Sequence, residues 1–334
     1  MATQKDIKNR IASVKNINKI TRAMEMVAAA RLRKAEQRIA ALRPYAEAIR
    51  RMTRRAVEAA ENVPSLPLLQ EHDSIDRVGL LLVTGDRGLA GSFNSQIIRA
   101  GTRRARELER DGKEIVWYAS GRRGASSLGF RGLDLAGSFT GFTDRPAFSD
   151  ARDIASGLIA GYTDDKVDRV EIFYNGYVSA MTQEIRHETL LPLQEAQAFG
   201  GEDEEGEGDG SEGGQDAGRR SDGDQGARRR SEGSDRPGGS DAGEGPDHSR
   251  SLWIYEPGPE EILERLAPDY VEISIYRALL ESTASEHGAR MTAMRSASEN
   301  ASDLIDDLTL EANRRRQAEI TQELMEVVAG AEGV

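Results

Sequence analysis

The 334-residue chain carries a net charge of −12, is 38% hydrophobic and contains no cysteine. The absence of cysteine excludes disulfides, thiol catalysis and thiolate metal sites, and the four histidines have no metal-ligand spacing. No stretch reaches the ~20 apolar residues that a membrane-spanning helix needs.

The charge is divided unevenly along the chain. Residues 1–60 contain 15 Lys and Arg against 5 Asp and Glu, whereas residues 200–250 contain 15 Asp and Glu against 7 Arg. This asymmetry between segments is more informative than the net charge. The basic N-terminus has no apolar signal region, and its amphipathic period continues far beyond any cleavage site. We therefore interpret it as mature structure rather than a targeting sequence.

The first predicted element is a long helix over residues 1–62. Its apolar residues recur at spacings of three and four, which is typical of one helical face. A helix of roughly 55 residues within this range extends ~80 Å and has to pair with another helix or with a partner protein. Pro64 and Pro67 end it and open a linker.

A small Rossmann-like α/β domain is predicted over residues 75–195. The runs "RVGLLLVTGD", "EIVWYAS" and "RVEIFYNGY" have the composition of strands. They alternate with the helical stretches "SQIIRAGTRRARELERDG" and "DARDIASGLIAGY". This alternation predicts a largely parallel sheet.

The turn "VTGDRGLAGSFNSQI" lies where a phosphate-binding loop would lie in such a domain. The spacing of Gly85, Gly88 and Gly91 does not match G-x-G-x-x-G, and no Gly-Lys-Ser/Thr follows. The alternative is a joint between a strand and a helix, with Asn94 or Ser95 capping the helix. We favour the joint, and a nucleotide-binding enzyme remains the competing hypothesis.

Residues 196–251 are predicted to be a disordered, acidic, glycine-rich insertion. Residues 200–250 contain no Val, Ile, Leu, Met, Phe, Trp or Tyr and hold 15 of the 34 glycines. Such a segment has no apolar surface whose burial could offset the loss of chain entropy. An inert loop is the favoured interpretation, and a role in partner binding or braking stays open.

The last predicted segment, residues 252–334, contains a second long helix from Tyr270 to Ala329. It again has apolar residues at helical spacing, and both terminal helices carry small residues, in "VAAA" and "SASENAS". We therefore predict that the two helices pair as a long antiparallel coiled coil, so the fold class is mixed α and β.

No arrangement of residues along the chain indicates catalysis. Asp164–Asp165 and Asp306–Asp307 are adjacent pairs whose side chains diverge, and Ser285 and His287 lie on a helix with no third group in view. The basic N-terminal helix could bind nucleic acid, an anionic membrane or an acidic protein surface. Its only aromatic residue is Tyr45, which weakens the first two possibilities.

Four motifs in order along the chain resemble one family. "IKNRIASVKNINKITRAMEMVAAARLRKA", "GDRGLAGSFN", "LWIYEP" and "ARMTAMRSASENASDLIDDLTLEANRRRQAEITQELMEVVAGA" are similar to the γ subunit of F-type ATP synthases. The similarity spans essentially the whole chain apart from the acidic insertion. Ala90 stands where the family often has cysteine, and the insertion lacks the cysteine pair of the chloroplast regulatory segment.

The resemblance implies a central-stalk rotor subunit without bond chemistry, cofactor or metal. In the family, the two terminal helices enter the (αβ)₃ hexamer, and the α/β domain contacts the ε subunit and the membrane c-ring. Rotation of this stalk couples ion flow to ATP synthesis or hydrolysis. For this chain the resemblance implies a peripheral position on the cytoplasmic side of a bacterial plasma membrane.

The resemblance also implies functional positions. Met24, Arg290, Gln317, Thr321 and Glu323 match positions that contact the catalytic β subunits or couple rotation to catalysis. By the same analogy, the basic residues Arg31, Arg33 and Lys34 pass acidic loops of the catalytic subunits, and Arg290 is expected beside one of those loops. Tyr255 and Glu256 match the pair that meets the rotor ring.

Overall fold

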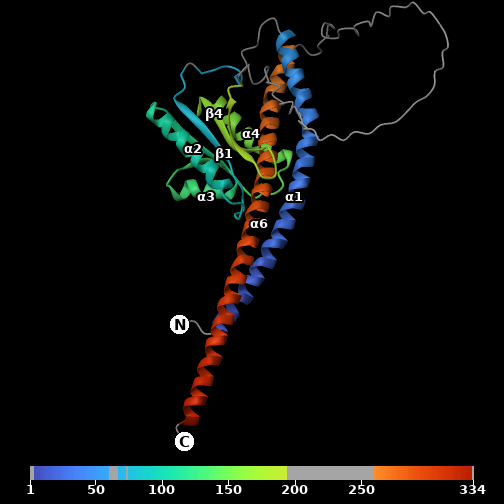
Figure 1. Ribbon diagram of the computed structural model, residues 1–334. Coiled ribbons are helices and arrows are strands. Elements are labelled where there is room, and N and C mark those ends of the chain that lie inside the picture. Colours follow the sequence, from blue (N-terminus) through green and yellow to red (C-terminus); the bar gives the residue numbers. More distant parts are fainter. Residues whose placement is uncertain (1–3, 60–66, 73, 194–258, 333–334) are drawn as a thin grey trace, which may run out of the picture. The chain divides into compact units, whose positions relative to one another are not determined.

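The computed structural model describes residues 4–59, 67–72, 74–193 and 259–332. Two long helices from the ends of the chain lie side by side, and the elements of an α/β domain lie on one side of this pair (Figure 1). In chain order the elements are α1 (Gln4–Ala59), β1 (Arg77–Val83), α2 (Phe93–Arg110), β2 (Glu114–Ser120), α3 (Arg122–Phe130), β3 (Leu135–Phe139), α4 (Phe148–Thr163), β4 (Arg169–Tyr177), β5 (Gln183–Leu191) and α6 (Pro259–Glu332).

The five strands form one sheet in the order β3-β2-β1-β4-β5. The strands β1, β2, β3 and β4 are parallel, and β5 joins the edge of β4 in the antiparallel direction. The predicted, largely parallel α/β domain is confirmed. The sequence patterns identified β1, β2, β4, α2 and α4, and they missed β3, β5 and α3.

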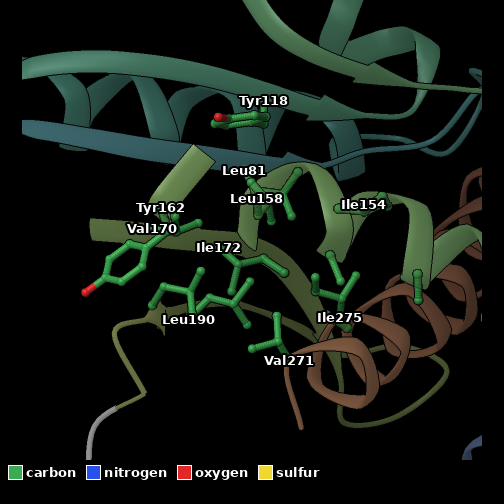
Figure 2. Close-up of a cluster of buried hydrophobic side chains, with 14 of the residues drawn as sticks. Leu81, Tyr118, Ile154, Leu158, Tyr162, Val170, Ile172, Leu190, Val271 and Ile275 are labelled. Atoms are coloured by element: carbon green, nitrogen blue, oxygen red, sulfur yellow. The ribbon is translucent and has the colours of Figure 1, made fainter. Parts of the chain in front are cut away.

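Helices cover both faces of the sheet. On one face, α2 and α3 pack on β1 and β2 through residues such as Leu82, Ile97 and Leu128. On the other face, α4 and the first half of α6 pack on β1, β4 and β5. Figure 2 shows this cluster, in which Ile154 and Leu158 of α4 meet Val271 and Ile275 of α6 over the sheet. The C-terminal helix therefore belongs to the core of the α/β domain.

This packing explains why α6 begins earlier than the predicted start at Tyr270. The helix starts at Pro259 and contains Pro268 in its interior. A proline there removes one helical hydrogen bond and normally ends or kinks a helix. Leu263, Leu266 and Ala267 are buried around it, and this burial stabilises the first turns.

The predicted cap of the helix after the glycine-rich turn is wrong. The N-cap of α2 is Ser92, which makes no side-chain capping bond. The Asn94 side chain instead accepts a hydrogen bond from the backbone N–H of Gly85 at 2.8 Å, so it closes the turn. Ser95 donates to the Ser92 carbonyl oxygen.

Candidate functional surface on the paired helices

Helices α1 and α6 pair in antiparallel fashion, as the sequence predicts. The contacts proceed in opposite directions along the two chains. Near the start of α1, the Asn18 amide donates to the Ser298 carbonyl oxygen at 3.0 Å and to the Ser302 hydroxyl at 2.8 Å. Near its end, Ile49 packs against Leu266 and Ile273.

The seam between the two helices is built from small side chains. Ala28, Ala35, Ala284 and Ala301 are all buried, and Leu32 packs in one cluster with Ala35 and Ala284. Small residues let two helix backbones approach closely. The prediction of a thin seam made from "VAAA" and "SASENAS" is confirmed by the burial of Ala28 and Ala301.

A crosslink across this seam tests the pairing. The Thr21 and Ser298 hydroxyl oxygens lie 2.6 Å apart, so Thr21→Cys with Ser298→Cys is expected to form a disulfide within one chain under mild oxidation. The chain has no cysteine that could compete. Arg22→Cys with Ser298→Cys is the matched control, because Arg22 is exposed on another side of α1. Mobility on a non-reducing gel reports the result, and crosslinks formed only between chains would contradict the pairing.

The paired helices are held to the α/β domain by polar contacts in the first half of α6. The Thr283 hydroxyl donates to the Thr143 carbonyl oxygen at 2.9 Å, and the Ser285 hydroxyl donates to the Asn175 carbonyl oxygen at 3.1 Å. From α1, Glu36 accepts a hydrogen bond from the Tyr177 hydroxyl. Both helices are therefore held by the same domain.

The basic residues of α1 divide into two groups. Arg31 forms an ion pair with Asp144 of the α/β domain, and Arg38 donates to the Pro146 carbonyl oxygen. Arg33 and Lys34 are exposed. The analogy with acidic loops of other subunits therefore suits Arg33 and Lys34 better than Arg31, whose charge is engaged inside the chain.

Arg290 faces its own chain. Its side chain is 9% exposed and its guanidinium pairs with Glu286 one turn earlier on α6. It also donates to the Gly88 carbonyl oxygen at 3.2 Å and to the His287 ring nitrogen at 3.3 Å. A contact with an acidic loop of another subunit would require the guanidinium to leave these partners.

Burial dominates the ionisation of this cluster. It raises the pKa of the Glu286 carboxyl above its usual value, and the Arg290 charge lowers it only in part. Burial and the same charge lower the pKa of His287 to about 4, so the imidazole is neutral at pH 7. The cluster thus holds one buried ion pair beside a neutral histidine.

The glycine-rich turn is occupied by the chain itself. A Cβ atom at Gly85 would lie 2.7 Å from the Glu286 carboxylate. The Asp86 carboxylate accepts hydrogen bonds from the backbone N–H groups of Arg122, Gly141 and Thr143. Burial alone would raise the pKa of this carboxyl, but the three amides outweigh it and lower the pKa.

This arrangement argues against a nucleotide site. In an open α/β sheet a ligand binds at the carboxyl ends of the strands, where free backbone amides hold a phosphate. Here Asp86 already takes those amides, and α6 fills the space beside Gly85. Among the described residues, no group of three or more His, Asp or Glu side chains is suited to hold a metal ion.

The other predicted positions on α6 lie near its C-terminal end. Gln317, Thr321 and Glu323 are exposed. From the Asn18 contact, the ~1.5 Å rise per residue of both helices places the start of α1 close to Arg314. Figure 1 shows that α6 continues past the start of α1. By their position in the sequence, the three residues belong to that continuation.

The same end of α6 exposes apolar side chains. Ile320 is 48% exposed, Leu324 61% and Val327 70%. Met24 of α1 is half-buried and is separated from this end along the paired helices. Tyr255 and Glu256 lie outside the described residues, as does the acidic insertion of residues 196–251.

The comparisons with known proteins bear on this two-helix structure. The family model described as ATP synthase matches residues 3–334. The chain is 38% identical to the ATP synthase gamma chain of Rubrobacter xylanophilus, over 100% of this chain and 99% of that protein. The chain belongs to the ATP synthase γ family. The central-stalk role expected from the sequence is thereby confirmed.

Further relatives agree with this assignment. The ATP synthase gamma chain of Streptomyces coelicolor is 40% identical over 97% of this chain and 93% of its own length. A chain in a structure of the Euglena gracilis mitochondrial ATP synthase, OSCP/F1/c-ring, has a TM-score of 0.59 at 15% identity and covers 99% of this chain and 94% of its own length. At that identity the structural likeness establishes the fold alone.

Sequence reasoning missed the residues that connect this γ chain's helices to its α/β domain. Glu286, Asp86 and Asp144 each contact a segment more than 30 residues away. Glu286 is one turn before Arg290 on a helix, and that i,i+4 spacing was a visible signal for the ion pair. Nothing in the local sequence indicated that the pair is buried.

Proposed function

We propose that this γ chain is a non-catalytic rotor that transmits rotation between an ion-driven ring and the catalytic sites of an ATP synthase. The observation that carries the proposal is the fastening of both long helices to one α/β domain. The contacts of Thr283, Ser285 and Arg31 join α1, α6 and the domain at one level. A torque applied to the domain then turns both helices together.

The exposed end of α6 is proposed to lie inside the hexamer of α and β subunits. Ile320, Leu324 and Val327 expose apolar surface there without a partner among the described residues, and such a patch marks an interaction site. We propose that the catalytic β subunits contact four residues of this chain: Met24, Gln317, Thr321 and Glu323.

Arg290 is proposed to contribute to coupling by holding the Gly88 turn against α6.

The α/β domain is proposed to face the membrane sector. The α/β domain contacts the ε subunit and the c-ring, with Tyr255 and Glu256 at the ring. The complex places the chain at the cytoplasmic face of a bacterial plasma membrane. In the part of the chain that the structure describes, no helix combines the length and the apolar composition of a membrane span. We expect no nucleic-acid partner and no cofactor.

The absence of bond chemistry is supported by how the polar groups are used. The groups at the carboxyl end of the sheet, where a ligand would bind, are committed to one another: Asp86 to three amides, and Glu286 to Arg290. Catalysis needs a nucleophile, acid or base that is aimed at a substrate. The described residues hold these groups in structural contacts instead.

Copurification tests the proposal. A tagged full-length chain expressed in its native cells is expected to bring down α and β subunits in about threefold excess, together with ATP hydrolysis activity. The control for non-specific capture is an unrelated tagged protein of the same host that has an α/β domain and no long helices. Recovery of the tagged chain alone, or with nucleic acid, would contradict the rotor function.

A further inference from the structure

Two ion pairs connect the edge strand β5 to helix α6. Arg186 of β5 donates to the Glu281 carboxylate of α6 at 3.2 Å. Two residues along the strand, the Glu188 carboxylate accepts from Arg277 of α6 at 2.8 Å. Along the strand, the positive Arg186 comes before the negative Glu188. Along the helix, Arg277, the partner of Glu188, comes before Glu281, the partner of Arg186.

The spacing of the two elements is matched. Two residues along a strand advance ~6.6 Å, and four residues along a helix advance ~6 Å. Arg186 and Glu188 therefore lie level with Glu281 and Arg277, respectively. The pairs form a two-rung ladder of alternating sign between the sheet edge and α6.

Neighbouring residues are arranged around the ladder. A Cβ atom at Gly176 of β4 would overlap the Arg186 side chain, so glycine at this position leaves a path for the guanidinium to reach α6. The Tyr174 hydroxyl donates to the other oxygen of Glu188 at 2.5 Å. Burial raises the pKa of this phenol, which keeps it protonated as a donor.

The ladder is a weak source of stability. Burial raises the pKa of the Glu281 carboxyl even though Arg186 and Arg277 lower it, so the ion pairs do not fully compensate for desolvation. Partly buried ion pairs often contribute little net stability, and their best-attested use is to select one register over another. The alternating signs suit that use.

We propose that the charge ladder formed by Arg186, Glu188, Arg277 and Glu281 fixes the axial register of α6 on the sheet. A shift of α6 by one turn would place Arg277 beside Arg186, or Glu281 beside Glu188. Either shift brings like charges together at the edge of the core. The inference rests on the proposed rotor function for its purpose, because a fixed register lets a torque on the α/β domain reach α6 without slip.

Exchanging the two charges of an ion pair tests whether the order of the charges, rather than the attraction within each pair, sets the register of α6. Exchange of one rung, Arg186→Glu with Glu281→Arg, keeps both rungs attractive but leaves two carboxylates on the strand and two guanidiniums on the helix. In this variant, a shift of α6 by one turn brings no like charges together. Exchange of both rungs, with Glu188→Arg and Arg277→Glu added, restores the alternation and is the matched control.

Spin labels measure the register in the full-length chain. Glu184→Cys on β5 and Asp269→Cys on α6 are exposed positions, and the chain has no native cysteine. We expect one distance in the wild type and in the two-rung exchange. The one-rung exchange is expected to show a second population displaced by about 5 Å, the length of one helical turn.

Three results would overturn the inference. One is a single wild-type distance in the one-rung exchange, because apolar packing would then set the register alone. Another is a failure of the two-rung exchange to restore the single distance. The third applies if the one-rung exchange does not fold, and it uses Gly176→Ala, which displaces Arg186 without changing a charge. This variant is then expected to show the second population of distances. A single wild-type distance in Gly176→Ala would overturn the proposal.

Coupling in the assembled enzyme gives an independent measurement. The one-rung exchange is expected to lower ATP-driven proton pumping several-fold relative to hydrolysis, and the two-rung exchange is expected to restore the ratio. If the wild-type chain does not assemble with catalytic subunits, the rotor function fails while the label distances still decide the register. If assembly succeeds and the distances do not respond, the rotor function stands and the ladder hypothesis fails.

Discussion

Replacement of Arg290 by alanine is expected to destabilise the chain by about 3–5 kcal/mol, the range for removing one partner of a buried ion pair. The change leaves the Glu286 carboxylate, whose side chain is 3% exposed, without its positive partner. It also removes the donor to the Gly88 carbonyl oxygen. Urea unfolding of the full-length chain measures the loss.

The pH dependence of this variant identifies the cause. The pKa of Glu286 is already raised by burial, and removal of Arg290 raises it further. A carboxyl with a raised pKa in the folded state destabilises the fold above that pKa, and the cost disappears as the pH falls below the unfolded value. The deficit of Arg290→Ala is therefore expected to shrink as the pH is lowered from 7 towards 4.

Helix α6 contains its own control. Arg265 pairs with Glu261 at the same i,i+4 spacing, with side chains 76% and 53% exposed. Arg265→Ala is expected to change stability by no more than ~0.5 kcal/mol, because exposed ion pairs are screened by solvent. Similar losses for the two variants would show that burial of the Arg290 pair is unimportant.

Glu171→Gln is expected to destabilise the chain by roughly 3 kcal/mol, as for other broken buried pairs. The Glu171 side chain is 1% exposed within the sheet. It accepts two hydrogen bonds from Arg104 of α2, at 2.9 and 3.0 Å, and contacts the His187 ring nitrogen of β5 at 2.7 Å. One carboxylate thus joins a helix and two strands.

The stability contributed by Glu171 depends on pH. Burial alone would raise its pKa, but the hydrogen bonds from His187 and Arg104 outweigh burial and lower the pKa to about 2. A lowered pKa in the folded state contributes stability above the unfolded value, near 4.5, and this contribution is lost as the pH falls towards 2. The difference between wild type and Glu171→Gln is expected to narrow over that interval.

Glu107→Gln is the matched control for this prediction. Glu107 pairs with the same Arg104 at 3.7 Å, but its side chain is 49% exposed. Its replacement is expected to change stability by ~0.5 kcal/mol or less. Equal and small effects of the two substitutions on thermal unfolding would mean that Glu171 is not a structural link.

Local composition was sufficient to predict some strands of the sheet from the sequence and insufficient to predict others. The runs that became β1 and β4 are rich in Leu, Val, Ile and Phe and are buried on both faces. The sequence of β3, "LAGSF", is made mostly of small residues. The sequence of β5, "QEIRHETLL", carries charges that propensity assigns to the surface. Three of its polar side chains, Arg186, His187 and Glu188, contact Glu281, Glu171 and Arg277, which lie on other elements.

The candidate positions show the same division. The exposure of Gln317, Thr321 and Glu323 agrees with a surface role, but partners for them come from the family resemblance and not from this chain. Arg290 was expected at an interface, and the structure places it against a turn 202 residues away in sequence. Tertiary contacts between such distant residues leave no trace in local periodicity.

The two long helices, their antiparallel pairing, the parallel strands β1, β2 and β4 and the γ family could be predicted from the sequence. These follow from periodicity, composition and motifs, because helical and strand patterns depend on neighbouring residues. How α6 joins the α/β domain, through Glu286 at the glycine-rich turn and the charge ladder at β5, could be seen only in the folded chain. Burial sets the energy of a charge, and burial depends on elements that are distant in sequence.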